Sequence, residues 1–96
     1  MQMSDLDREE IIKQSWDIHA QVEAHYLTLK AKKGDADWLE KQRVLLADMA
    51  LHLLQTALNP DEINLEKLRN NLNSILVISD QFLPESDLKK AATKLF

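Results

Sequence analysis

Four side chains of the sequence have the types and the spacing of a metal-binding cluster. His19 and Glu23 are four residues apart, which puts both on one face of a helix. Asp48 and His52 have the same separation. If the chain turns back near residue 35, antiparallel pairing brings the two pairs to the same level, where imidazole and carboxylate groups could bind zinc or iron as they do in other helical bundles.

Two observations favour a solvated Asp48–His52 pair over such a site. The Glu-x-x-His motif of carboxylate di-metal bundles is absent from the sequence. Asp48 and His52 also lie at the centre of the only polar stripe of their helix, which we expect to face water. Metal binding is therefore the alternative function, and the sequence predicts no resident metal and no other cofactor.

A third histidine, His25, lies within the main apolar stripe of the first helix. Its segment, residues 24–30, resembles the phosphoacceptor helix of histidine-phosphotransfer domains, which are also small helical bundles. In that family a lysine and a glycine follow the histidine closely on the exposed face, whereas here Lys30 comes five residues later and Gly34 nine. We expect His25 to point inward as a core or boundary residue, and phosphoryl transfer is only what the resemblance implies.

The composition excludes several classes of protein. The chain has 96 residues and no cysteine, so disulfide frameworks, thiol nucleophiles and zinc fingers are excluded. The net charge of -4 disfavours nucleic acid and anionic membranes as partners. The acidic N-terminus and the lack of a long apolar run predict a cytoplasmic protein. No serine has a recognisable histidine and acid partner, so we expect no catalytic residues and no enzymatic activity.

Capping residues and apolar spacing predict four helices in a single domain, residues 1–96. The first helix begins after Ser4 and runs to Lys32 and Lys33, and its inward stripe is Ile11, Ile18, Val22 and Leu29. The second covers residues 37–58, with Asp37 and Glu40 as a capping box and Trp38 packed on the first helix. The third begins at Pro60 or after Asn64, and a short fourth helix follows Pro84.

These elements predict an all-α fold. No segment shows the alternation of apolar and polar residues that a half-buried strand requires. Short connections between long helices favour antiparallel neighbours. We therefore expect an antiparallel up-down-up bundle of three long helices plus a short C-terminal helix.

The second helix has more apolar surface than two neighbouring helices can cover. Eleven of its fifteen residues from 44 to 58 are apolar in the sequence VLLADMALHLLQTAL. At 100° per residue they span an arc of roughly 220°, whereas an amphipathic helix needs little more than about 100°. Either the C-terminal helix covers the remainder through Leu88, Leu95 and Phe96, or another copy or another protein does.

The first helix carries a second apolar strip, away from its main stripe. It consists of small residues with one tryptophan and one leucine, a composition that suits close approach of a partner helix and anchors it. We predict that the partner-binding residues are Trp16, Ala20 and Leu27 on this helix and Leu51, Leu54 and Leu58 on the second.

The sequence as a whole predicts a small acidic interaction protein without enzymatic activity. We expect it to associate with itself, with a different protein partner, or with both, and with neither nucleic acid nor membranes. In size, acidity and architecture it is similar to helical export chaperones and to bacteriocin immunity proteins. No specific motif accompanies that similarity, so it assigns no residue a role.

Overall fold

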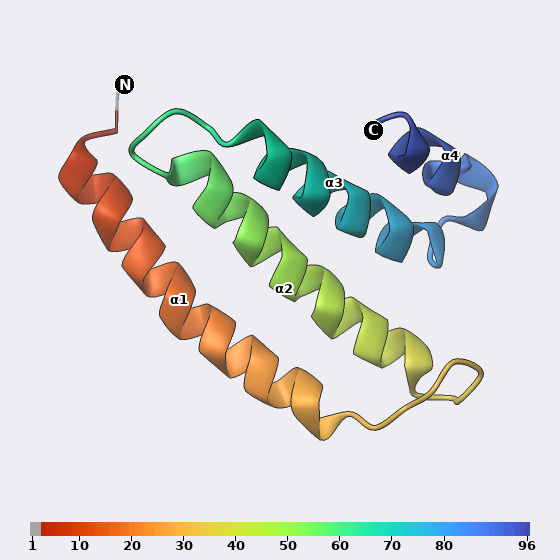
Figure 1. Ribbon diagram of the computed structural model, residues 1–96. Helices are drawn as coiled ribbons and strands as arrows, with labels where there is room; N and C mark the ends of the chain where they lie inside the picture. The colour runs from red at the N-terminus through yellow and green to blue at the C-terminus, as the bar shows by residue number, and fades with distance from the viewer. Residues whose placement is uncertain (1–2) are drawn as a thin grey trace.

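Four helices make up the computed structural model, which describes residues 3–96 (Figure 1). They are α1 (Asp5–Thr28), α2 (Trp38–Leu58), α3 (Leu65–Asp80) and α4 (Leu88–Thr93), with a 3₁₀ turn at Pro84–Ser86. The long helices α1, α2 and α3 run up, down and up, and the described residues contain no strand. The all-α fold predicted from the sequence is confirmed.

The helix α1 begins where the sequence predicts and ends earlier. The Ser4 hydroxyl accepts a hydrogen bond from the Asp7 backbone N–H at 3.1 Å, and the Asp7 carboxylate accepts one from the Ser4 N–H at 3.4 Å, which completes a capping box. At the other end the Thr28 hydroxyl donates to the His25 carbonyl and Leu29 is extended. The helix therefore ends at Thr28, and Gly34, with φ of 99°, serves the following turn instead.

The predicted capping box of α2 is absent, and of the two predicted starts of α3 the structure has the second. Asp37 is the N-cap of α2, but its backbone (φ of -90°, ψ of 3°) is not extended as in an ordinary N-cap, and its side chain makes no capping bond. Glu40, its expected partner, pairs with Arg43 at 3.0 Å. The helix α3 does not begin at Pro60. Its cap is Asn64, the alternative start, whose side chain accepts from the Lys67 N–H at 3.0 Å.

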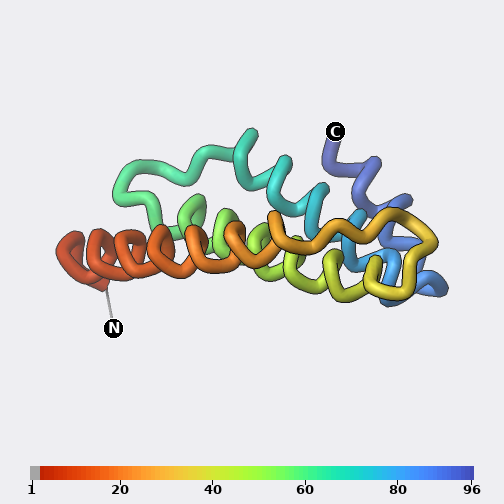
Figure 2. The backbone as a smooth tube through the Cα atoms, turned by 90° about the horizontal axis from the view of Figure 1, so that it is seen from below, coloured from red at the N-terminus to blue at the C-terminus, as the bar shows by residue number. Residues whose placement is uncertain are grey.

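The helix α2 lies between α1 and α3, and α4 packs along α3 on the side away from α1 (Figure 1). Seen from below, α1 and α2 form one level of the molecule and the first part of α3 rises above them (Figure 2). Because the main contacts of α4 are with α3, the C-terminal helix does not cover the apolar arc of α2.

Few of the described residues are fully buried, and polar ones are among them. Only Ile78 and Ala92 are buried apolar residues among those described, whereas Ser15, Gln42 and Asn71 are buried polar ones. Gln81 caps the C-terminal end of α3 and bonds to both Gln42 and Trp38. Its side-chain amide group donates to the Gln42 side-chain oxygen at 2.8 Å, and its side-chain oxygen accepts from the Trp38 indole N–H at 2.9 Å. The indole of Trp38 is thus hydrogen-bonded to the end of α3, a contact that the sequence did not predict. Side-chain hydrogen bonds as well as apolar contacts therefore hold neighbouring helices together. We call the line of contact between two neighbouring helices a seam.

Candidate functional site

A cluster of two imidazoles and one carboxylate lies in the seam between α1 and α2. His19 comes from α1, and Asp48 and His52 come from successive turns of α2. The His19 Nε2 atom is 2.8 Å from Asp48 Oδ1 and 3.1 Å from His52 Nε2. His52 Nε2 is 3.4 Å from Asp48 Oδ2. Three groups able to bind a metal ion or a proton therefore converge on one point.

The polar stripe of α2 faces the seams and not bulk water, which corrects the expectation from the sequence. The side chains of His19, Asp48 and His52 retain 12%, 16% and 36% of their exposed area. The physical reason is that both neighbouring helices offer polar partners. Gln55 donates to the Ser15 hydroxyl of α1 at 3.2 Å, and Thr56 accepts from the Asn71 amide of α3 at 2.7 Å.

Two further residues of α1 surround His19. The carboxylate of Glu23 lies 3.6 Å from His19 Nδ1, the ring nitrogen that faces away from the cluster. The Trp16 ring meets the His19 ring edge-on, with 5.6 Å between the ring centroids. A pocket of about 400 Å³ opens beside the cluster, and Glu23, Leu27 and Leu45 help to line it. The antiparallel pairing expected from the sequence is therefore present, and it brings His19 and Glu23 to the level of Asp48 and His52.

The structure contradicts the expected inward orientation of His25. This residue is exposed and lies at the rim of a groove between α1 and α2, together with Gln21 and Arg43. It is displaced from the buried face of α1, which is centred on Ser15 and His19. The centre of the buried face of α1 is polar. A prediction that follows only the apolar residues therefore places the centre of this face about one residue away from its true position.

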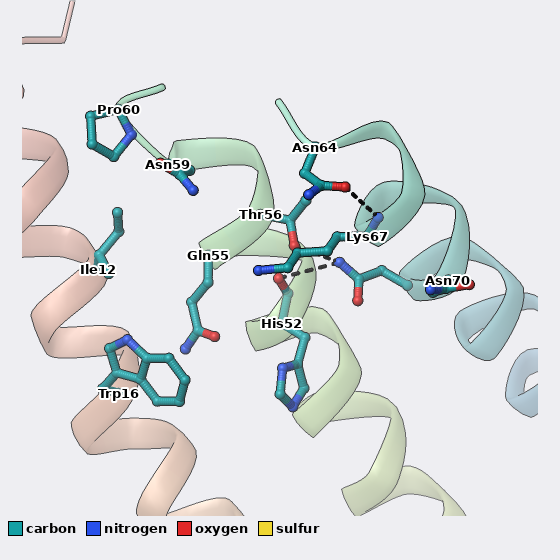
Figure 3. A pocket seen from close by; sticks show the side chains of 11 residues that line it. Ile12, Trp16, His52, Gln55, Thr56, Asn59, Pro60, Asn64, Lys67 and Asn70 are labelled. Carbon is teal, nitrogen blue, oxygen red and sulfur yellow. Dashed lines mark hydrogen bonds between the residues drawn. The ribbon is translucent and has the colours of Figure 1, made fainter. Parts of the chain in front are cut away.

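The predicted partner-binding residues of α1 lie along the side of the molecule on which α1 and α3 face each other. Trp16 is 53% exposed and Leu27 is 68% exposed, and Ala20, which is exposed too, lies between them. A groove of about 520 Å³ runs between α1 and α3 at this side (Figure 3). Its floor and far wall are polar: Gln55 of α2 and Asn64, Lys67 and Asn70 of α3 line it opposite Trp16.

The predicted partner-binding residues of α2 share a helical face with a second groove. That groove has a volume of about 410 Å³ and lies between α1 and α2, with Ile18, Val22, Val44 and Ala47 as its apolar lining. Leu51, Leu54 and Leu58 follow Ala47 at helical spacing and are half-buried, whereas Ala47, Ala50 and Ala57 are exposed. The two sets of predicted residues therefore form two surfaces, one beside Trp16 and one beside Ala47.

Several residues that shape these sites were not singled out from the sequence. Ser15 and Asn71 are buried and bond to the polar stripe of α2. Gln42 and Gln81 form the corresponding link at the other end of α2 and α3. Ser15 could have been found, because it sits between Ile11, Ile12, Ile18 and Val22 at the centre of an otherwise apolar stripe.

Comparisons with known proteins add no identification. No protein family, curated protein or solved structure matches the chain. Within residues 3–96, none of the helices combines the length and the apolar character needed to cross a bilayer.

Proposed function

We propose that this protein is a non-enzymatic interaction module that associates with a second copy of itself through an apolar face of α2. The observation that supports the proposal is that the single chain exposes more surface than a compact monomer of its mass would. The single chain exposes 7115 Å² at a mass of 11.1 kDa, whereas a compact monomer of that mass exposes about 5,700 Å². Its radius of gyration, 15.2 Å, likewise exceeds the value of about 12.5 Å for a compact domain of this length.

The excess of exposed area is about as large as the area that a permanent homodimer buries. About 1,400 Å² per chain is in excess of the compact value, so two chains that bury it would form an interface of about 2,800 Å² in total. Interfaces of 2,000 Å² or more are typical of permanent homodimers. Among the described residues, twelve large apolar side chains are at least 36% exposed, and one of these, Ile18, lines the groove between α1 and α2.

The face beside Ala47 suits a second copy better than the one beside Trp16. It is apolar across both helices, from Ile18 of α1 to Leu54 of α2. Ala47 and Ala50 are small and exposed, so a partner helix can approach closely there. Its rim carries Glu40 and Arg43, which have opposite charges, so a two-fold copy can meet this face without net repulsion. The groove beside Trp16 is floored by amides and is less suited to an apolar partner.

Sedimentation equilibrium from about 1 to 100 μM tests the proposal, because this range brackets ordinary protein affinities. We expect the mass to rise from 11.1 kDa toward twice that value. Ala50→Glu should raise the dimer dissociation constant by more than about 100-fold, since each two-fold interface would bury two carboxylates. Glutamate is a strong helix former, so the substitution should leave helical content unchanged.

Ala20→Glu is the matched variant. It makes the same substitution at an exposed position of α1, on the strip of Trp16 and Leu27, and should leave the dimer intact. If Ala20→Glu dissociates the dimer and Ala50→Glu does not, the interface is the α1 strip. A wild-type chain that stays monomeric at all concentrations contradicts self-association.

A further inference from the structure

We propose that His19, Asp48 and His52 bind a divalent transition-metal ion of the zinc type. The three side chains belong to two helices and present one ligand atom each within 4.8 Å of one another. A metal ion placed between them would tie α1 to α2. This inference goes beyond the proposed dimer and does not depend on it.

The separations of the ligand atoms fit a small tetrahedral ion. Zinc binds imidazole nitrogen and carboxylate oxygen at about 2.0 to 2.2 Å, so its ligand atoms lie about 3.3 to 3.5 Å apart. The two Nε2 atoms are 3.1 Å apart. His19 Nε2 is 2.8 Å from Asp48 Oδ1, and His52 Nε2 is 3.4 Å from the other oxygen of the same carboxylate, Oδ2. With one ligand atom taken from each residue, the three atoms lie within 4.8 Å of one another, so an ion between them would require rotation of the side chains to reach the tetrahedral spacing.

Hydrogen bonding within the cluster does not account for this convergence. His19 Nε2 faces both His52 Nε2 and Asp48 Oδ1, and one ring N–H can be directed at only one of them. The contact to Asp48 Oδ1 is short but lacks hydrogen-bond geometry, so this buried oxygen has no hydrogen-bond partner. A buried carboxylate oxygen without a partner is costly, and a cation between the three groups would satisfy it.

Glu23 occupies the position that supports a metal-binding histidine. In most metal sites the second ring nitrogen of the histidine donates to a carboxylate or carbonyl, which fixes the ring and its tautomer. Glu23 lies 3.6 Å from His19 Nδ1, while His19 Nε2 points into the cluster. Trp16 contacts the His19 ring from the side. The 3.6 Å separation is longer than a hydrogen bond, so a small rotation of the exposed Glu23 side chain would let it accept from His19 Nδ1 while Nε2 points into the cluster.

The types of the three ligand atoms indicate which class of metal ion the site would bind. Calcium and magnesium prefer shells made entirely of oxygen ligands. Two imidazole nitrogens with one carboxylate oxygen suit zinc, cobalt or nickel, for which imidazole is a favoured ligand. Three protein ligands leave one coordination position, and the pocket beside the cluster gives solvent access to it. We assign that position to water and infer no reaction there.

The test is metal titration of the full chain, produced without a histidine tag and freed of metal with a chelator. Calorimetry with ZnCl₂ should show one ion bound per chain. CoCl₂ should produce the visible absorption bands of tetrahedral cobalt, and zinc should abolish them. His19→Ala and His52→Ala should each weaken zinc binding by more than about 100-fold, because loss of an outer partner alone weakens it by about 10- to 100-fold. Glu23→Gln, an outer partner, should weaken it by about tenfold.

His25→Ala is the matched control, because His25 is the third histidine of the chain, lies on the same helix as His19 and is exposed. It should bind zinc like the wild type. Absence of stoichiometric binding to the wild-type chain overturns the proposal, and so does an equal loss in His25→Ala and His19→Ala. If the cluster variants fail to fold, the imidazole NMR spectrum of the wild type decides: zinc must shift the His19 and His52 signals and leave those of His25 in place.

Discussion

Replacing Asn71 by alanine tests whether polar contacts hold α2 to α3. The Asn71 side chain is 9% exposed. It donates to Thr56 Oγ1 at 2.7 Å and, less favourably, to the His52 carbonyl at 3.4 Å. One good buried hydrogen bond contributes about 1 kcal/mol, and a buried partner left unsatisfied costs about 1 to 3 kcal/mol. We therefore expect Asn71→Ala to lower the free energy of unfolding by about 2 kcal/mol.

Urea unfolding followed by far-ultraviolet circular dichroism measures this loss, and in a thermal scan it corresponds to about 8 to 16 °C for a domain of this size. Asn70→Ala is the control, because Asn70 is the exposed neighbour on the same helix and its loss should change stability by less than about 0.5 kcal/mol. A double-mutant cycle with Thr56→Val should return a coupling of about 1 kcal/mol between Asn71 and Thr56. Equal effects of Asn70→Ala and Asn71→Ala, or a coupling near zero, would refute this account of the seam.

Two smaller predictions concern the ends and the core of the bundle. Ser4→Ala removes the hydroxyl that accepts from the Asp7 N–H in the α1 capping box, and it should lower the free energy of unfolding by about 1 kcal/mol, whereas Ser4→Asp should retain most of that stability. Ile78→Ala removes the larger of the two buried apolar residues of the described chain and should cost about 2 to 5 kcal/mol. The same substitution at Val77, which is 38% exposed, should cost far less, and chemical denaturation of each variant gives the comparison.

The fold could be predicted because its determinants are local. The capping box at Ser4 and the cap at Asn64 are short-range bonds that the residue types themselves specify. Apolar spacing and short connections then leave few arrangements for three long helices. Of the two predicted starts of α3, Pro60 is excluded for an equally local reason: the Asn59 side chain accepts from the Asp61 N–H at 3.2 Å, which forms a turn before the cap at Asn64.

The seam could not be predicted because its determinants are not local. A stripe of Asp48, His52 and Gln55 on an apolar helix is ordinarily a solvated face. Its burial depends on residues of the preceding helix: His52 meets His19, 33 residues away along the chain, and Gln55 meets Ser15, 40 residues away. The spacing within one helix places its polar residues on one face, but only the partner decides whether that face meets water or another polar stripe. This is why the cluster could be located from spacing while its burial was missed.

The orientation of α2 connects the two proposals. A helix with one polar stripe and a wide apolar arc cannot turn the whole of both toward its neighbours. In this chain the stripe faces the seams, where His19 meets Asp48 and Asn71 meets Thr56. Part of the apolar arc, including Ala47 and Ala50, is consequently exposed. Such an orientation is unfavourable for an isolated chain, since apolar area buried in the interior contributes about 25 cal/mol per Å² and area left in water contributes nothing.

Both proposed ligands would favour this orientation of α2. A bound ion would stabilise the seam, and a second copy would cover the apolar arc. The two effects act on different faces of α2, so each can be measured in a variant that leaves the other unchanged.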